Sequence, residues 1–302
     1  KTYADTYFPI SGTYYAPTAC TFNFGQNPSF SGQITAGTNA DGSGKGLFKY
    51  APPTGFLALC EDNLPAPAIA DPGDHFKTVL YTGSGSARAV TGVGFKPDLV
   101  WIKKRTTAGD HKLIDSVRGA GLILESNTTD VEGDETGNFS GFNNNGFDLS
   151  ATTAGAWNES SYNYVAWCWK AGGASLPNTD GTLTSQVSVN ETAGFSIATY
   201  TTGGTATTFG HGLGKKPAFA LFKARNNSGN WAVYHQSLGT NTIRLSTTGA
   251  EDTSADAFNS TAPTDTLMYL GTWAGTNGTD INWVSYLWAE IEGYSKFGRL
   301  CG

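Results

Sequence analysis

Residues 76–105 read FKTVLYTGSGSARAVTGVGFKPDLVWIKKR, and residues 195–225 repeat the phrase as FSIATYTTGGTATTFGHGLGKKPAFALFKAR. The correspondence continues with YVAWCWK at 164–170 beside WVSYLWAE at 283–290. The stretch Phe76–Lys170 therefore returns about 119 residues later as Phe195–Glu290. A repeat of this kind sets the number of domains and constrains the fold before any other pattern is considered.

The clearest strand in the first copy is Asp98–Arg105. Leu99 and Trp101 point to one side of it while Val100 and Ile102 point to the other, so both faces are apolar up to the charged end. A strand with two apolar faces must be covered twice, which predicts a central place in a packed sandwich. Turn signals such as TGSGS separate the strands, and hardly any window shows helical periodicity. The sequence therefore predicts an all-β chain of tandem antiparallel β-sandwiches, of the jelly-roll or Greek-key type.

Three blocks organise the chain. The first block, 1–74, ends in a Pro-rich stretch, 51–74, which is expected to be an extended connector because proline cannot donate to a sheet interior. Residues 75–173 hold the first copy of the repeat. Residues 174–302 hold a linker and the second copy.

The two copies match at positions that form strands and turns, but they differ at residues that could act as acids, bases or nucleophiles. His111 falls opposite Trp231, and Asp115 falls opposite His235, so no acid, base or nucleophile is kept in both copies. None of the four histidines lies in a nucleophile-elbow or zincin motif. Paired carboxylates for glycoside hydrolysis stay open, because their pairing is spatial rather than sequential. The repeat indicates a scaffold without enzymatic activity, with specificity in its variable loops.

The composition restricts the classes of partner that the protein is expected to bind. Charged residues make up 15% of the chain and aromatic residues 13%, with 39 glycines, which is typical of a turn-rich, aromatic-cored β protein. The net charge of -6 disfavours nucleic acid, which requires clustered Lys and Arg. No apolar run approaches the roughly 18 residues of a membrane span, so membrane insertion is not expected.

Neither metal nor cofactor binding is predicted. Cys20, Cys60, Cys168 and Cys301 lack the spacing of a zinc or redox motif, and a Cys20–Cys60 disulfide stays open. The acidic residues Asp130, Glu132, Asp134 and Glu135 could gather oxygens for calcium. Their spacing matches an EF-hand loop only loosely, however, and a solvated loop is the favoured interpretation.

Two tryptophans are candidate ligand contacts. Trp157 and Trp273 lie in polar Gly/Thr/Asn surroundings just ahead of the closing strand of each copy. An aromatic face held on a loop can stack on a sugar ring or anchor a protein contact. The alternative is that each indole folds back to cap its own sandwich.

Several phrases together resemble a known family. YAPPTGFLALCEDNLPAP, GVGFKPDLVWIKKR, YVAWCWKAGG, GHGLGKKPAFALFKAR and AEIEGYSKFG are similar to uncharacterised tandem β-sandwich repeats in virion proteins of tailed phages, especially marine ones. In that family a SPRY-type, lectin-like domain commonly precedes the repeats, and its last strand resembles ACTFNFGQ at 19–26. The resemblance implies that the first block is the end of such a SPRY- or concanavalin-like sandwich, whose earlier strands would precede Lys1. It implies no catalytic or ligand residues.

These observations predict a structural or adhesive virion protein. It would be a tail or fibre component on the phage particle, outside the cell, that assembles with itself and with other virion proteins and contacts a host-surface glycan. The alternatives are a secreted carbohydrate-binding protein of cellular origin and, less favoured, a polysaccharide depolymerase on the same scaffold.

Overall fold

The fold is described from a computed structural model, in which residues 24–25, 27–30, 32–64, 67–151, 157–253 and 256–298 can be described. The chain divides into two compact units, 1–66 and 67–302. The division falls inside the stretch 51–74 that the sequence assigns to a connector. Both copies of the repeat lie in the second unit.

The first unit is built from turns around Asp41. The carboxylate of Asp41 accepts hydrogen bonds from the backbone N–H groups of Ser43, Lys45 and Ala58 and from the side-chain amide of Asn63. These bonds, chiefly the one from Ala58, hold the pKa of Asp41 at about 2. The described part of this unit contains a single 3-10 turn, η1 (Glu61–Asn63), and no strand. Most of ACTFNFGQ and Cys20 lie outside the described residues, so the SPRY-like block stays a prediction.

The second unit is all-β, as predicted, and its described residues contain no α-helix. After the 3-10 turn η2 (Pro72–Asp74), the first copy contributes β1 (Phe76–Thr82), β2 (Arg88–Thr91), β3 (Leu99–Lys104), β4 (Lys112–Asp115), β5 (Leu122–Glu125), β6 (Gly133–Asp134), β7 (Phe139–Asn143), β8 (Gly146–Leu149) and β9 (Asn163–Trp169). Then follow β10 (Leu176–Asn178), β11 (Ser185–Asn190), β12 (Phe195–Gly203), β13 (Thr207–Gly210), β14 (Pro217–Ala224), β15 (Ala232–His235), the 3-10 turn η3 (Gln236–Leu238), β16 (Ile243–Arg244), β17 (Leu267–Leu270) and β18 (Thr279–Ala289).

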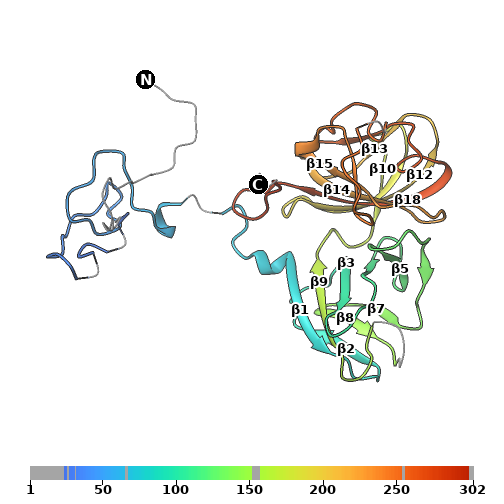
Figure 1. Ribbon diagram of the computed structural model, residues 1–302, viewed down its shortest axis with the longest axis horizontal. Helices are drawn as coiled ribbons and strands as arrows, with labels where there is room; N and C mark the ends of the chain where they lie inside the picture. The colour runs from blue at the N-terminus through green and yellow to red at the C-terminus, as the bar shows by residue number, and fades with distance from the viewer. Residues whose placement is uncertain are drawn as a thin grey trace. The chain divides into compact units, whose positions relative to one another are not determined.

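The two copies share one topology. In the six-stranded sheet the order is β1-β9-β3-β4-β5-β6, and in the seven-stranded sheet the order β12-β18-β14-β15-β16 repeats its first five places. Strands β10 and β11 extend the second sheet beyond β12. A smaller sheet accompanies each copy, β2-β8-β7 in the first and β13-β17 in the second, and every pairing between these strands is antiparallel. Figure 1 shows the two copies side by side.

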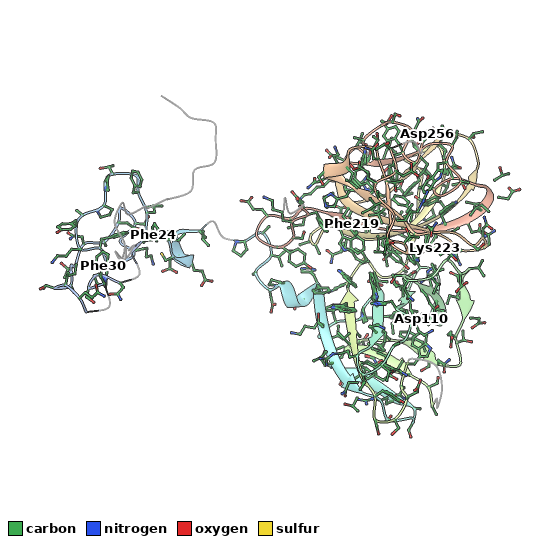
Figure 2. The ribbon with its side chains drawn as sticks, in the orientation of Figure 1. Phe24, Phe30, Asp110, Phe219, Lys223 and Asp256 are labelled. Carbon is green, nitrogen blue, oxygen red and sulfur yellow. The ribbon has the colours of Figure 1, made fainter. Side chains whose placement is uncertain are left out.

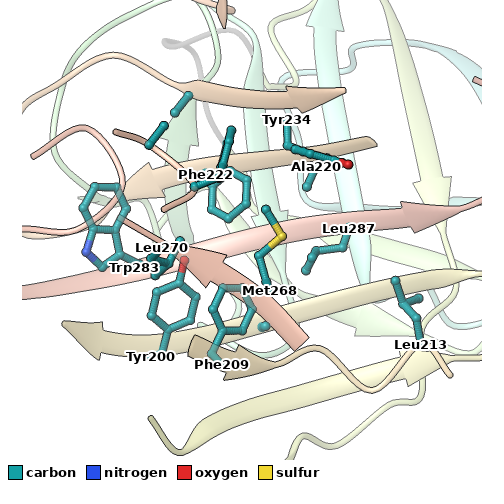
Figure 3. Close-up of a cluster of buried hydrophobic side chains, with 14 of the residues drawn as sticks. Tyr200, Phe209, Leu213, Ala220, Phe222, Tyr234, Met268, Leu270, Trp283 and Leu287 are labelled. Carbon is teal, nitrogen blue, oxygen red and sulfur yellow. The ribbon is translucent and has the colours of Figure 1, made fainter. Parts of the chain in front are cut away.

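Three large apolar cores and one small cluster, Ile69, Ala193 and Ile291, hold the described part of the unit together. One lies inside the first copy, around Tyr164, and a second lies inside the second copy, around Tyr200, Phe209 and Phe222 (Figure 3). The third core joins the copies, because residues from the outer faces of both large sheets pack into one cluster. Its members include Leu99, Leu113, Phe195, Leu221, Trp231 and Tyr286.

Strand β3 shows why the sequence pattern led to this arrangement. Val100 and Ile102 are fully buried in the core of the first copy, while Leu99 is fully buried in the core between the copies. The strand also lies inside its sheet, between β9 and β4. The prediction of a centrally placed strand covered on both faces is therefore confirmed, and the second cover is the other copy of the repeat.

Candidate functional site

Trp157 is not an exposed ligand contact, and the prediction that it is exposed was wrong. Its side chain is 0% exposed and packs against Phe139 in the core of the first copy. The phenol of Tyr81 donates to the carbonyl of Trp157, and the Lys112 ammonium lies 5.2 Å from the indole ring centre. The polar residues around Trp157 concealed a core position, so the alternative interpretation, an indole that folds back onto its own sandwich, describes this residue.

Trp273 is half-buried against the core of the second copy. The Arg244 guanidinium lies 5.6 Å from its ring centre, and a Cβ at Gly275 would overlap the indole. Part of the ring is therefore accessible, but Trp273 and Trp157 belong to different sandwiches and do not form one site.

The acidic segment 130–135 serves as a contact between the copies. Glu132 accepts hydrogen bonds from Arg118 of the first copy and from Arg225 of the second, at 2.8 to 3.0 Å. The Lys223 ammonium donates to the Thr129 carbonyl across the same boundary. Within the described residues, no group of three or more His, Cys, Asp or Glu side chains is placed to hold a metal ion. The favoured prediction, a solvated loop, holds for Asp130, which is exposed, but was wrong for Glu132.

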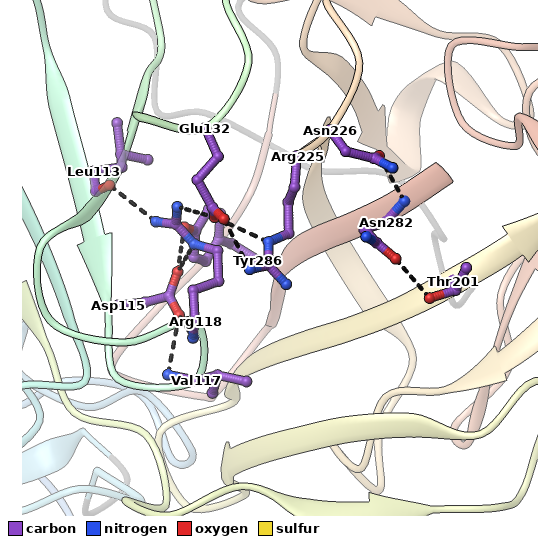
Figure 4. A network of polar contacts seen from close by, with 10 residues as sticks. All are labelled: Leu113, Asp115, Val117, Arg118, Glu132, Thr201, Arg225, Asn226, Asn282 and Tyr286. Atoms are coloured by element: carbon purple, nitrogen blue, oxygen red, sulfur yellow. Dashed lines mark hydrogen bonds and ion pairs between the residues drawn. The ribbon is translucent and has the colours of Figure 1, made fainter. Parts of the chain in front are cut away.

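A fully buried polar cluster lies beside Glu132 (Figure 4). The Asp115 carboxylate accepts from the Arg118 guanidinium and from the Tyr286 phenol, and all three side chains are buried. Burial raises the pKa of Tyr286 well above its usual value, so its hydroxyl remains a donor. Buried charges of this kind are costly unless they are paired and hydrogen-bonded. The ion pairs of Arg118 lie within the first copy, and the second copy completes their hydrogen bonding with the Tyr286 hydroxyl. The cluster therefore fixes one relative placement of the two large sheets.

The best candidate site is an aromatic cavity between the copies, of about 420 Å³. We call it the aromatic pocket, and its volume lies in the range of roughly 300–1,000 Å³ that is typical of small-molecule sites. Its aromatic lining comprises Phe76, Trp101, Trp169, Phe195, Phe219, Trp288, Tyr294 and Phe297, together with the imidazole of His75. Phe219 lies on the side of the second copy that faces the first (Figure 2).

Strand register brings these rings together in equivalent pairs. Phe76 pairs with Trp169 in the sheet of the first copy, and Phe195 pairs with Trp288 in the sheet of the second. The ring centres lie 4.9 Å and 5.1 Å apart, respectively. Trp169 and Trp288 also contact each other across the boundary, with ring centres 6.0 Å apart. Each copy therefore supplies one half of the aromatic lining.

The segment after β18 forms the rim of the pocket. The Glu290 carboxylate accepts hydrogen bonds from the Gln236 side chain and the Phe297 backbone N–H, and it thereby ties residues 290–297 to η3. This lets the ring of Phe297 stack on Phe219, with centres 5.7 Å apart. The pKa of Glu290 is lowered, chiefly by the bond from Phe297.

His75 forms a further contact between the copies beside this rim. The side-chain amide of Asn190 lies 2.9 Å from His75 Nδ1 and donates to it, and the His75 ring meets Tyr294 edge-on. The pocket is thus bounded by the start of the first copy and the end of the second.

Two of the tryptophans that line the pocket have indole N–H groups without a protein acceptor in the part of the chain that the structure describes. Among the described residues, the Nε1 atoms of Trp169 and Trp288 donate to no protein acceptor, and neither is among the buried side-chain atoms that lack a partner. Both rings are half-exposed, so these donors are accessible to solvent or to a ligand. None of the described residues that line the pocket is Asp, Glu, Lys or Arg. The site offers aromatic faces and uncharged donors.

The sequence alone does not predict this pocket. In the sequence, Phe76 and Phe195 have the pattern of strand packing residues, and Trp169 and Trp288 lie near the ends of aromatic strands. The available signal was that both copies keep an aromatic residue at the start of the first strand and at the end of the last. That the two outer faces pack on each other could not be deduced from either copy alone.

No helix among the described residues is long and apolar enough to cross a membrane. A family model described as a domain of unknown function, DUF7483, matches residues 71–302. No curated protein and no solved structure matches the chain. Because the family match spans both copies and well over half of the sequence, the chain belongs to the DUF7483 family.

Proposed function

We propose that the protein is a non-enzymatic structural and adhesive component of a phage virion, and that it binds a host-surface glycan in the aromatic pocket. The observation that carries the binding role is the half-buried pair Trp169 and Trp288, which line a ligand-sized cavity. The location on a tail or fibre rests on the sequence resemblance.

An uncharged sugar ring suits this lining. The π face of an indole carries negative charge density and attracts the C–H groups on the apolar face of a pyranose, while the indole N–H can donate to a ring hydroxyl. A uronic or sialic acid would lose hydration on entry and find no cation among the described lining residues. Uncharged glycans are therefore the favoured ligand class.

The lining also favours binding over turnover. Hydrolysis of a glycosidic bond generally uses two carboxyl groups on either side of the bond, and the pocket lining contributes none. Its titratable side chains are His75 and Tyr294. This arrangement supports an adhesive role better than that of a depolymerase.

Self-assembly is supported by the first unit. Between residues 24 and 64 the large apolar side chains are mostly exposed, including Tyr50, Phe56 and Leu59, whereas Ala58 is the buried apolar residue among the described positions there. Exposed apolar surface on this scale is typical of protein contacts. We propose that it is covered in a homo-oligomer or by other virion proteins.

A glycan array that carries both neutral and acidic glycans tests the binding role. The parent protein and the Trp273→Ala variant should bind neutral glycans, while Trp288→Ala and Trp169→Ala should lose at least tenfold in affinity. Leu245→Trp provides a second test that removes no aromatic residue, because Leu245 is an exposed lining residue and a larger ring there should block entry. Absence of binding to any glycan, or loss of binding in Trp273→Ala alone, would overturn the proposal.

Two further measurements test the proposed location on the virion and the proposed lack of enzymatic activity. Mass spectrometry of purified phage particles should detect the protein, and its absence from them would favour a secreted carbohydrate-binding protein of cellular origin. Incubation with host polysaccharide should release no new reducing ends, and any release that depends on the protein would contradict the non-enzymatic assignment.

A further inference from the structure

A second hollow adjoins the aromatic pocket. It has a volume of about 300 Å³ and is lined by Trp101, His111, Trp167 and Trp169. We call it the side groove. Trp101 and Trp169 also line the pocket, so the two hollows are adjacent and share these two side chains.

The side groove follows the direction of a strand. Trp167 and Trp169 are two residues apart on β9, so they point to the same face of the sheet and lie about 6–7 Å apart along it. Trp101 pairs with Trp167 in the register of β3 and β9, and the two rings meet edge-on with centres 6.3 Å apart. The result is a row of indoles that leads out of the pocket.

His111 supplies a directed donor at this row. The Nε1 group of Trp101 donates to His111 Nδ1 at 3.0 Å, which fixes the neutral ring with its proton on Nε2. Burial and the nearby Lys103 lower the pKa of His111, which favours the same neutral form. The backbone N–H of His111 donates to Asn127, which holds the residue in place. Within the described residues, Nε2 of His111 donates to no protein group, so it can donate to a ligand.

We infer that the ligand is an uncharged oligosaccharide of at least two sugar units, with one ring in the aromatic pocket and the next in the side groove. The first ring lies against Trp169 and Trp288, the second lies along Trp167, and His111 donates to a hydroxyl of the second. This inference rests on the proposed glycan-binding function and adds a requirement for chain length to it. A single-ring site would need only the pocket, whereas the row of indoles continues beyond it.

Calorimetry with sugars of increasing length tests the inference. The probes are homo-oligomers of one to four units of glucose, galactose, mannose and N-acetylglucosamine. For any series that binds, affinity should rise at least tenfold between one unit and two or three, and then level off, because the second ring fills the side groove. Equal affinity for all lengths would overturn the inference while leaving the glycan-binding function intact. Failure of every series and of the glycan array would instead overturn the proposed function.

Variants separate the two subsites. Trp167→Ala should abolish the gain with chain length but leave the affinity for one unit unchanged, and that retained affinity also shows that the variant is folded. His111→Ala removes a side chain from the groove without removing an indole. It should reduce the increase in affinity between one sugar unit and two or three at least threefold. The Trp273→Ala control should keep the full gain. Persistence of the gain in both Trp167→Ala and His111→Ala would place the second ring elsewhere.

Discussion

The phenol of Tyr286 in the second copy donates a 2.7 Å hydrogen bond to the Asp115 carboxylate in the first copy, and both side chains are fully buried. The same phenol accepts from the Arg118 guanidinium at 3.1 Å. The Tyr286 hydroxyl thus bonds, across the boundary between the copies, to both members of a buried ion pair of the first copy. The aromatic pocket lies at the same boundary, so this contact bears on the geometry of the pocket as well as on stability.

Replacing Tyr286 with Phe should lower the free energy of unfolding by about 1–3 kcal/mol, because it leaves buried charged groups short of a hydrogen bond. Urea unfolding followed by tryptophan fluorescence measures the change. Tyr234→Phe is the matched control, since Tyr234 is buried in the second copy and its hydroxyl bonds to no described residue. Equal effects of the two substitutions would show that the Tyr286 hydroxyl contributes nothing specific.

Glu132→Gln should weaken the contact between the copies, since it removes the charge shared by Arg118 and Arg225 and leaves the buried Arg118 with one fewer anion. We expect a loss of about 1–3 kcal/mol in unfolding free energy and faster proteolysis in the segment 128–135. The control is Asp130→Asn, an exposed residue of the same segment, which should change stability by less than about 0.5 kcal/mol. A larger effect at Asp130 than at Glu132 would contradict the assigned contact.

His211 should make the protein sensitive to mild acid. Burial lowers the pKa of His211 to about 4, with Nδ1 accepting from the Leu213 backbone N–H and Nε2 placed against the Thr264 carbonyl. The unfolded chain takes up this proton near pH 6.5 and the folded chain does not, so stability is full above that pH and is lost as the pH falls toward 4. The loss is on the order of 3 kcal/mol.

Urea unfolding between pH 7 and 4 measures this dependence. The His211→Gln variant should lose less stability than the parent over the window, whereas His235→Gln should follow the parent. Identical pH profiles for all three proteins would show that His211 is not responsible.

Cys168 should resist alkylation in the folded protein. Its side chain is 0% exposed in the core of the first copy, and burial raises the pKa of its thiol to about 12. Cys60 has a half-buried free thiol in the first unit. After treatment with iodoacetamide at pH 8, peptide mass spectrometry should find Cys60 modified and Cys168 intact until urea is added. Modification of both at equal rates would contradict the packing of β9.

The sequence predicted the architecture well because the repeat and the alternation in Asp98–Arg105 are local signals. Apolar residues on both faces of a strand indicate that both faces are buried, but they do not indicate which part of the protein buries them. The identity of the second cover was not predictable in this way, since it is the other copy, and only the packed structure shows Leu99 and Leu221 in one core.

The site residues were harder to predict because exposure is a tertiary property. Trp157 has polar neighbours in sequence and apolar neighbours in space, so its local composition indicated the wrong environment. Glu132 lies in an acidic stretch whose pattern favours solvent, and its two arginine partners lie 14 and 93 residues away, one in each copy. Trp288 looked like strand packing because nothing in the repeat distinguishes a ring that lines a cavity from a ring that fills a core.

The contact between Trp169 and Trp288 joins equivalent positions of the two copies, and the same face of each large sheet points inward. A symmetric pair of single-copy chains would meet in this way. When both copies belong to one chain, the two sides of their boundary need not be identical. In this protein the two sides differ. On one side of the boundary, Asp115 of the first copy meets Tyr286 of the second. The equivalent residues are His235 of the second copy and Trp167 of the first, and Trp167 lines the side groove on the other side. One side of the boundary between the copies is therefore closed by a buried polar cluster, while the other side carries the side groove.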